Sequence, residues 1–461
     1  MHALTFVSTV LLIAAPVLAA PARQHPLVHS RPDPYRKDYQ DQYDHKVDSI
    51  GKDLHPEPLR NGDGTSVLGP RNRLREQENP DMIRPPTTDH GDFKNMRWSF
   101  ADSHMRIEEG GWTRQTTRRE LDSSVEIAGV NMRLDEGVIR ELHWHKEAEW
   151  AYVLEGKVRV TALDTEGGSF VDDVEKGDLW YFPPGHPHSL QGLAPIGTEF
   201  LLIFDNGGFS EESTFLLTEW LKHTPKSVIA ENFRLPPQVF DTLPDTEKYI
   251  FQGELPGSVD EEKPKTFKKS KLEFTHKMLD QKPEVTSGGR VRITDSHNFP
   301  ISKTIAAGHL EIEPGAMREM HWHPNADEWS FFISGRARVT IFGAQGNART
   351  FDYTAGDVGV VPKNMARGLQ LRKNRPTRKL IHLQGHFIEN LSDDEPLEVL
   401  EIFRADEFQD FSLFQWLGET PQRLVRDHLF QNDPKGAAKF AKAIQSAEKD
   451  AIKAQVFQSE L

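Results

Sequence analysis

The chain has 461 residues, a formal net charge of −14 and a hydrophobic fraction of 37%. This length allows two domains that each bury a core, and the acidic balance argues against a nucleic-acid-binding protein, which needs a basic face. The chain contains no cysteine, so disulfides and thiol chemistry are excluded.

The N-terminus predicts a secretory signal peptide over residues 1–20. Residues 4–20 are apolar or small, carry no charge and end in Val17-Leu18-Ala19-Ala20, where small residues suit a cleavage site. A membrane anchor is the alternative, which Pro16 and the alanines disfavour. No second stretch is apolar enough to cross a bilayer. We therefore expect a secreted, extracellular protein without membrane contact.

Residues 21–80 are rich in Pro, Asp, Arg and His, which predicts an extended or partly disordered arm. The rest of the chain is an internal duplication, because Gly137–His145 matches Gly315–His323 and Gly177–Pro183 matches Gly356–Pro362. The duplication predicts two domains, at residues 81–245 and 290–425. A charged, turn-rich linker at 246–289 joins them, and a helical tail follows at 426–461.

Each half contains short apolar-alternating segments separated by Gly and Pro, such as Val153–Leu163 and Arg336–Phe342. This pattern predicts strands. Helical patterns are confined to the ends, for example Gly436–Gln455. The expected fold class is therefore all-β, with two tandem β-sandwich or jelly-roll barrels and short flanking helices.

The duplicated segments contain a pattern typical of a metal site. His143 and His145 point to the same face of a strand, Glu149 follows, and His188 comes from a later strand. The corresponding residues of the second half are His321, His323 and Glu328. Three neutral imidazoles and one carboxylate suit Mn²⁺ or Fe²⁺ better than Zn²⁺, because four protein ligands would close a tetrahedral zinc site.

The fourth histidine of the second half is displaced. His188 lies five residues after Pro183, but five residues after Pro362 is Arg367, which has no acceptor for a cation. His386 takes this position if residues 366–384 are an insertion. We interpret them as a retained intron, with a genuine surface loop as the alternative. A real loop that displaces His386 would weaken or empty the second site.

These residues also carry a family resemblance. Gly137–Gly156 and Gly177–His188 resemble the two cupin motifs, and residues 80 to 425 resemble bicupin oxalate decarboxylases, in phrases such as "RELHWH" and "GDLWYFPPGHPHS". The resemblance implies two cupin (double-stranded β-helix) barrels with one Mn²⁺ in each, or two per chain if the second site is intact. It also implies conversion of oxalate to formate and CO₂ with dioxygen as co-catalyst, and a homo-oligomer.

Two arginines and two glutamates complete the expected active site. Arg140 and Arg318 each precede the first metal-binding histidine by three residues, and arginine can pair bidentately with a substrate carboxylate; a surface salt bridge is the alternative. Ser210–Thr214 resembles the family's flexible lid, with Glu212 in place of Asn. The resemblance makes Glu211 the general acid, against the alternative of an exposed acidic turn. Glu401 matches a glutamate near the family's second metal and ranks below Glu211.

Three other functions share parts of this pattern. An oxalate oxidase would use the same ligands but release H₂O₂ and CO₂, and the lid acid Glu211 argues against it. Another metal-dependent cupin dioxygenase would need a roomier apolar pocket. A storage bicupin would lack the ligands. Because only the first half has regular ligand spacing and a lid acid, we expect the first barrel to carry the decarboxylation.

Overall fold

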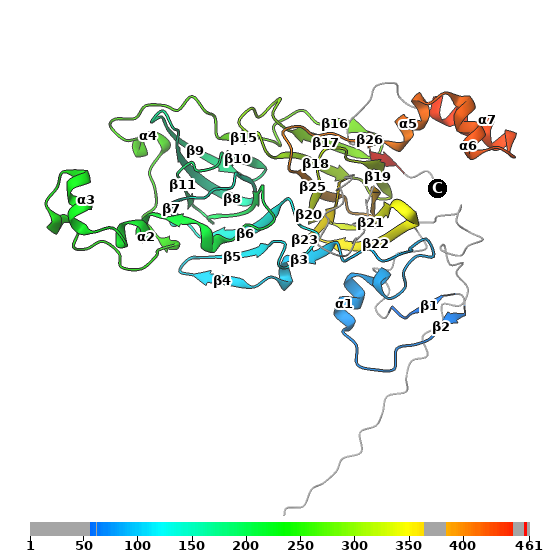
Figure 1. The fold of residues 1–461 in the computed structure, drawn as a ribbon, viewed down its shortest axis with the longest axis horizontal. Coiled ribbons are helices and arrows are strands. Elements are labelled where there is room, and N and C mark those ends of the chain that lie inside the picture. Colours follow the sequence, from blue (N-terminus) through cyan, green and yellow to red (C-terminus); the bar gives the residue numbers. More distant parts are fainter. Residues whose placement is uncertain (1–55, 61, 364–383, 446–455, 459–461) are drawn as a thin grey trace, which may run out of the picture.

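The computed structural model describes residues 56–60, 62–363, 384–445 and 456–458. It contains two β-barrels that lie side by side, with helices at the two outer ends (Figure 1). The expected signal peptide at 1–20, the arm up to residue 55 and all but the last residue of the expected insertion lie outside the described residues.

The first barrel is built from one sheet whose strands all pair antiparallel. The expected strand Val153–Leu163 is the greater part of its longest strand, β8. The strands of this sheet are β4 (Met105–Glu108), β5 (Gly111–Thr116), β6 (Ala128–Leu134), β7 (Val138–Trp144), β8 (Glu149–Leu163), β9 (Ser169–Glu175), β10 (Asp178–Phe182), β11 (His188–Gly192), β12 (Thr198–Phe204), β13 (Phe215–Leu216), β14 (Ile250–Gln252) and β15 (Thr275–Lys277).

The second barrel repeats this arrangement in two sheets. The expected strand Arg336–Phe342 corresponds to β21. One sheet contains β3 (Arg97–Ser99), β16 (Glu284–Thr286), β17 (Gly289–Thr294), β18 (Ala306–Ile312), β20 (Glu328–Ser334), β23 (Asp357–Val361) and β25 (Leu397–Phe403). The other contains β19 (Ala316–Trp322), β21 (Arg336–Gly343), β22 (Asn347–Thr354), β24 (Gly385–Asn390), β26 (Phe411–Ser412) and β27 (Val456–Gln458).

Helices are short and flank the barrels, so the predicted all-β class is confirmed. The expected helix at 436–455 begins at Pro434 and is described as far as Gln445. Within the described residues no helix is long and apolar enough to span a bilayer. The helices are α1 (Arg73–Glu78), α2 (Leu217–Lys222), α3 (Lys226–Phe233), α4 (Val259–Glu262), α5 (Leu413–Glu419), α6 (Gln422–Leu429) and α7 (Pro434–Gln445).

Strand β8 bends so that it joins both faces of the first barrel. Its first residues pair with β10 and β12, and its later residues pair with β9 and β11. Gly156 lies at the change, with a φ of 77°, and a Cβ there would meet the Gly197 carbonyl oxygen at 2.0 Å. Only glycine fits this conformation and this close approach. The bend leaves Glu149 at the start of β8, beside the strands that carry the histidines.

Three hydrophobic clusters hold the molecule together. One fills each barrel, and a third lies between them and includes the fully buried Trp150 and Trp329. Full burial of a large apolar side chain contributes about 1.5–3 kcal/mol. The shared cluster therefore packs the two barrels against each other as one unit.

Residues that precede the first barrel in sequence lie against the second. Strand β3 pairs with β23, with Trp98 opposite Val358, and buried Asp81 forms an ion pair with Arg338 of β21. Figure 1 shows this N-terminal part beneath the second barrel. The chain therefore contacts the second barrel first and only then enters the strands of the first barrel. The domain limits expected from the sequence stay predictions.

Candidate metal centres and active site

The first candidate metal centre is formed by β7, β8 and β11. His143 of β7 lies directly opposite His188 of β11, and their ring centroids are 4.2 Å apart. His145 and Glu149 complete the group, in which one ligand atom from each residue lies within 4.8 Å of the others. All four residues are buried. The structure thus brings together the four residues that the sequence predicts for this site.

Backbone carbonyls orient the three imidazoles. The Nδ1 atom of His143 donates to Glu141 O, that of His145 donates to Glu147 O at 2.7 Å, and that of His188 donates to His186 O at 2.8 Å. Each bond leaves Nε2 as the acceptor that can bind a cation. The Nε2 atom of His188 is buried without a hydrogen-bond partner among the described residues. Such a buried acceptor fits a metal ligand.

The second candidate centre has the same geometry. His321 lies opposite His386, their ring centroids are 4.0 Å apart, and His323 and Glu328 complete a buried group with ligand atoms within 4.8 Å of one another. His386 of β24 therefore stands in this group, and Arg367 lies outside the described residues. Glu328 Oε2 lies 3.0 Å from His323 Nε2 and 2.8 Å from His386 Nε2.

Burial sets the charge of these ligands. It holds the pKa of His143 and of His321 well below the ordinary value, and the nearby Arg140 and Arg318 lower these pKa values further. Burial opposes the charge on Glu149, but His188 and His145 lower its pKa below the ordinary value. His323 differs, because burial opposes its charge but Glu328 raises its pKa above the ordinary value. A divalent cation needs neutral imidazoles beside an ionised carboxylate.

The outer oxygen of each ligand glutamate has its own hydrogen-bond donor. Trp180 Nε1 donates to Glu149 Oε1 at 2.8 Å, whereas the Ser330 hydroxyl donates to Glu328 Oε1 at 2.6 Å. Such donors orient a metal ligand and tune its basicity. Sequence reasoning missed both residues, although the Gly-Asp motif with Trp180 in one half and Gly359 in the other was the available signal.

Arg140 lies in the wall of a small cavity beside the first metal centre. Its side chain is buried, its Nη1 donates to Tyr249 O at 3.4 Å, and its guanidinium carbon lies 4.1 Å from the centroid of the Tyr249 ring. Burial lowers the pKa of Arg140. No ion pair joins Arg140 to a carboxylate among the described residues, although the charges of Glu211 and Glu149 in the same cavity wall act on it. Its positive charge is therefore left for a bound anion.

Arg318 occupies the corresponding position in the second barrel but is neutralised. Its Nη2 donates to Asp410 Oδ2 at 2.7 Å and its Nε donates to Glu401 Oε1 at 3.4 Å. Arg318 and Glu401 are fully buried. Burial raises the pKa of Glu401 to about 7, against the lowering effect of Arg318. Two acids beside one arginine make this site far less suited to an anion.

Glu211 closes the cavity of the first centre. It begins a short 3₁₀ turn at Glu211–Ser213, and Thr113 Oγ1 donates to its Oε1 at 3.1 Å. The residue is half-buried, and it lines the cavity beside Arg140 and the metal ligands. Burial raises the pKa of this carboxyl group, while Arg140 and Thr113 lower it. A carboxyl group with a raised pKa can carry a proton to a reacting atom.

The cavity itself is narrow, with a volume of about 10 Å³, which is roughly the room that one water molecule needs. Access for a larger molecule requires the segment that contains Glu211 to move. The cavity is lined by Arg140 and Glu211, by the ligands His143, His145 and Glu149, and by Met132, Leu190, Leu202, Phe204, Phe209 and Thr214.

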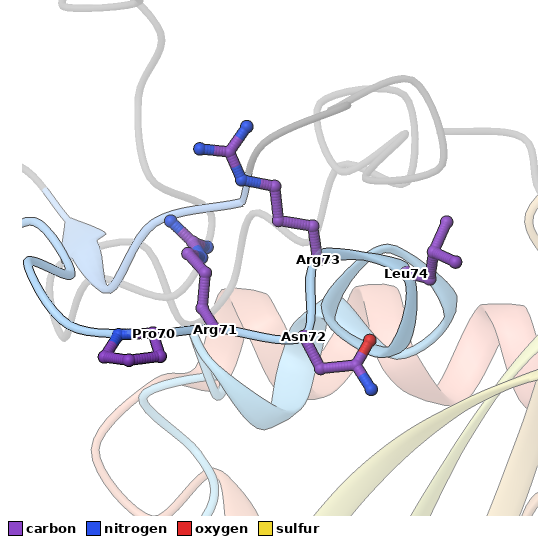
Figure 2. A pocket seen from close by; sticks show the side chains of 5 residues that line it. All are labelled: Pro70, Arg71, Asn72, Arg73 and Leu74. Carbon is purple, nitrogen blue, oxygen red and sulfur yellow. The ribbon is translucent and has the colours of Figure 1, made fainter. Parts of the chain in front are cut away.

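A second hollow lies far from both centres. It is open to solvent and lined by Pro70–Leu74 ahead of and within α1 (Figure 2). Of the two arginines in its wall, Arg71 is paired with Glu57 and Glu76, and Arg73 is exposed. The five residues that line the hollow include no metal-ligating group.

Comparison with known proteins agrees with this geometry. The Cupin family profile matches residues 100–240 and 276–370. The chain is 52% identical over 377 residues to oxalate decarboxylase OxdC of Bacillus subtilis (strain 168), covering 81% of this chain and 92% of that protein. It is 40% identical to a probable oxalate decarboxylase of Arthroderma benhamiae, covering 79% of this chain and 86% of that protein.

Solved structures match as well. A structure that addresses the Mn(II) centres of Bacillus subtilis oxalate decarboxylase superposes with a TM-score of 0.79 at 48% identity, and the match covers 88% of this chain and all of that one. Variants of the same protein superpose equally well. With its two barrels and two complete ligand sets, this chain belongs to the cupin superfamily and, within it, to the family of bicupin oxalate decarboxylases.

Proposed function

We propose that this protein is a manganese-dependent oxalate decarboxylase that converts oxalate to formate and CO₂, with dioxygen required for turnover. The observation that carries the proposal is a buried arginine without a carboxylate partner, Arg140, together with the interior acid Glu211, both beside a His₃Glu centre. The relatives named oxalate decarboxylase support the same reaction.

Two Mn²⁺ ions fit the chain. His143, His145, Glu149 and His188 would hold one, and His321, His323, Glu328 and His386 would hold the other. Three nitrogens and one oxygen leave room for further ligands on an octahedral ion. Bound manganese would supply a Lewis-acidic and redox-active centre for the cleavage of the C–C bond.

In the first barrel, one residue binds the substrate and another transfers a proton. Arg140 pairs with one carboxylate of oxalate and fixes its orientation, which a planar guanidinium does bidentately. When the C–C bond breaks and CO₂ leaves, the remaining carbon must gain a proton to become formate. Glu211 supplies that proton, because burial keeps its carboxyl group protonated to a higher pH. The narrow cavity leaves room for about one water molecule beside these groups.

The second barrel is proposed to bind metal without carrying the main reaction. Arg318 is held by the buried Glu401 and the partly buried Asp410, so an entering dianion would meet two acids. Glu401 stays a candidate proton carrier there and ranks below Glu211.

The residues that line the cavity argue against the two alternative enzymes, an oxalate oxidase and another cupin dioxygenase. An oxalate oxidase shares the metal ligands but needs no acid that protonates carbon, and the interior Glu211 favours decarboxylation. A cupin dioxygenase that acts on larger apolar molecules is disfavoured by the charged groups Arg140 and Glu211 in the wall of the cavity beside the first centre.

The proposed reaction is tested by incubating the manganese-loaded protein with oxalate and oxygen and then measuring formate, CO₂ and H₂O₂. The proposal expects formate and CO₂ in equal amounts with little peroxide. Peroxide as the main product would overturn it in favour of the oxidase.

We also propose that the protein is secreted, on the strength of the apolar stretch at residues 4–20. N-terminal sequencing of the protein recovered from the culture medium tests this. A mature chain that begins after about residue 20 supports secretion, and retention of the full chain inside cells contradicts it.

A homo-oligomer is proposed from two exposed aromatic clusters. Trp144 stacks on Phe215 beside Trp220, which is 52% exposed, and Trp322 stacks on Phe411 beside Trp416, which is 58% exposed. Exposed aromatic patches of this kind mark association surfaces. Light scattering on the purified protein decides between a monomer and an oligomer.

A further inference from the structure

Tyr249 has a backbone conformation that its side chain disfavours. Its φ is 52°, in the left-handed region that bulky residues rarely adopt. The residue precedes β14, is 1% exposed and lies next to Ile250, which pairs with Arg140. Strained residues persist only where their surroundings fix them, and they gather at functional sites.

Glu141 fixes this conformation from β7. Its Oε2 accepts hydrogen bonds from Tyr249 N at 2.8 Å and from Lys248 N at 3.1 Å, and its own backbone N–H donates to Tyr249 O at 2.9 Å. Its other oxygen accepts from Thr218 N and Oγ1. One buried carboxylate therefore ties the strand that carries Arg140 to the segment that carries Tyr249.

The ring and the carbonyl of Tyr249 both face Arg140. The guanidinium carbon of Arg140 lies 4.1 Å from the ring centroid, and its Nη1 donates to Tyr249 O. The guanidinium of Arg106 lies 3.6 Å from the same centroid, but Glu108 and Glu247 balance its charge. The Tyr249 hydroxyl has no hydrogen-bond partner among the described residues. Ring and backbone, rather than the hydroxyl, make the contacts.

We propose that Tyr249 is a positioning residue for the first active site, and that it holds the Arg140 guanidinium in place for a substrate carboxylate without neutralising its charge. An aromatic face attracts a cation through its quadrupole, so it orients the guanidinium and leaves the full positive charge to the anion. A carboxylate in the same place would compete with the substrate. The inference rests on the proposed substrate role of Arg140.

In the second barrel, the sequence position that corresponds to Tyr249 is not aromatic, and Arg318 has different partners from Arg140. The sequences Tyr249–Gln252 and Gln455–Gln458 correspond, because Ile250 pairs with Arg140 as Val456 pairs with Arg318. Gln455 stands in the sequence where the first half has Tyr249. Arg318 is held by Glu401 and Asp410 instead. The aromatic support therefore goes with the arginine that has no ion-paired carboxylate among the described residues.

The test compares variants of the manganese-loaded full chain in oxalate decarboxylation. Tyr249→Leu removes the ring and is expected to raise KM for oxalate about tenfold, the size of a buried cation–π contact, at unchanged manganese content. Tyr249→Phe keeps the ring and is expected to restore the lower KM. Phe251→Leu, on the same strand but opposite Ile139, is the matched control and is expected to leave KM unchanged.

A double variant shows whether Tyr249 acts through Arg140. If it does, Tyr249→Leu adds little to the rise in KM that Arg140→Lys causes, because coupled residues are not additive. Full additivity, or an unchanged KM in Tyr249→Leu, overturns the inference while the role of Arg140 stands. An unchanged KM in Arg140→Lys instead overturns the proposed role of Arg140.

Replacement of Tyr249 by phenylalanines with increasing numbers of fluorine atoms gives the same test without a change of shape. Fluorine weakens the negative face of the ring, so KM is expected to rise stepwise with each added fluorine. A flat series contradicts the proposal even if the leucine variant fails to fold.

Discussion

Trp180 and Glu149 form a hydrogen bond of 2.8 Å between the indole Nε1 and the outer oxygen of the metal-binding carboxylate. Trp180 stands opposite Ala151 in the sheet, whereas the corresponding pair of the second barrel is Gly359 opposite Ser330. The hydrogen-bond donor is therefore Trp180 of β10 in the first barrel, where β8 has Ala151. In the second barrel it is Ser330 of β20, where β23 has Gly359. Each barrel thus orients its glutamate from a different strand.

Replacing Trp180 with Phe is expected to weaken manganese binding at the first centre about 10–100-fold, because a second-shell donor to a ligand is lost. Titration with Mn²⁺, followed by electron paramagnetic resonance, measures this directly. Ser330→Ala is expected to weaken only the second centre.

Trp329→Phe is the matched control for the loss of volume. Trp329 is as deeply buried as Trp180, but its Nε1 has no hydrogen-bond partner among the described residues. It should leave the affinity of the first centre unchanged. Equal losses in both tryptophan variants would show that packing, and not the hydrogen bond, holds Glu149.

Arg318→Gln is expected to destabilise the protein by about 3–5 kcal/mol, since it removes the cation that pairs with the fully buried Glu401 and the partly buried Asp410. Arg140→Gln leaves no ion-paired carboxylate behind and should lower stability much less while it abolishes oxalate turnover. Thermal or denaturant unfolding of the two variants separates these effects, and equal stabilities would contradict the contrast between the barrels.

The pH profile should follow the protonation of Glu211. Its pKa is raised by burial, and catalysis needs its protonated form. Formate production is therefore present below this pKa and lost as pH rises through it, at a higher pH than an exposed glutamate with a pKa of about 4.3 would give. The profile of kcat/KM measures the pKa in the free enzyme.

Thr113→Val sharpens the pH test. The Thr113 hydroxyl lowers the pKa of Glu211, so its loss should move the decline in activity to higher pH. Glu212→Gln, on the exposed neighbour, should leave the profile in place. A profile that neither variant moves, or one that moves only with Glu212, argues against Glu211 as the acid.

Deletion of residues 366–384 should leave a protein with two manganese ions per chain. The deletion gives His386 the same distance from Pro362 that His188 has from Pro183, and His386 already stands in the second ligand group. Metal analysis checks the prediction, and transcript sequencing tests the retained intron. A deletion variant with one ion would mean that the segment helps to form the second site.

Much of the fold was predictable because the internal duplication can be recognised from matching segments of the sequence. Gly137–His145 and its copy identify the metal-binding strand twice, and alternating apolar residues identify β8 and β21. The ligand residues follow from period-two geometry on a strand. His386 follows from spacing once Arg367 is rejected as a ligand.

The environments of the two arginines were not predictable in the same way. Arg140 and Arg318 occupy equivalent positions in the repeat, and their difference comes from Tyr249, Glu401 and Asp410, which reach them from remote segments. No local pattern encodes a contact across about a hundred residues of chain. The exchange of Trp180 for Ser330 was missed for a different reason, since the donor comes from the neighbouring strand β10 in the first barrel and from the strand of Glu328 itself in the second.

The central claim is that Glu211, beside the first metal centre, protonates the product carbon. The measurement that tests it most directly is the rate of formate release from oxalate by Glu211→Gln at full manganese content. The account predicts a fall of about a hundredfold or more, since a positioned general acid contributes at least that much. Unchanged formate production by this variant would contradict it.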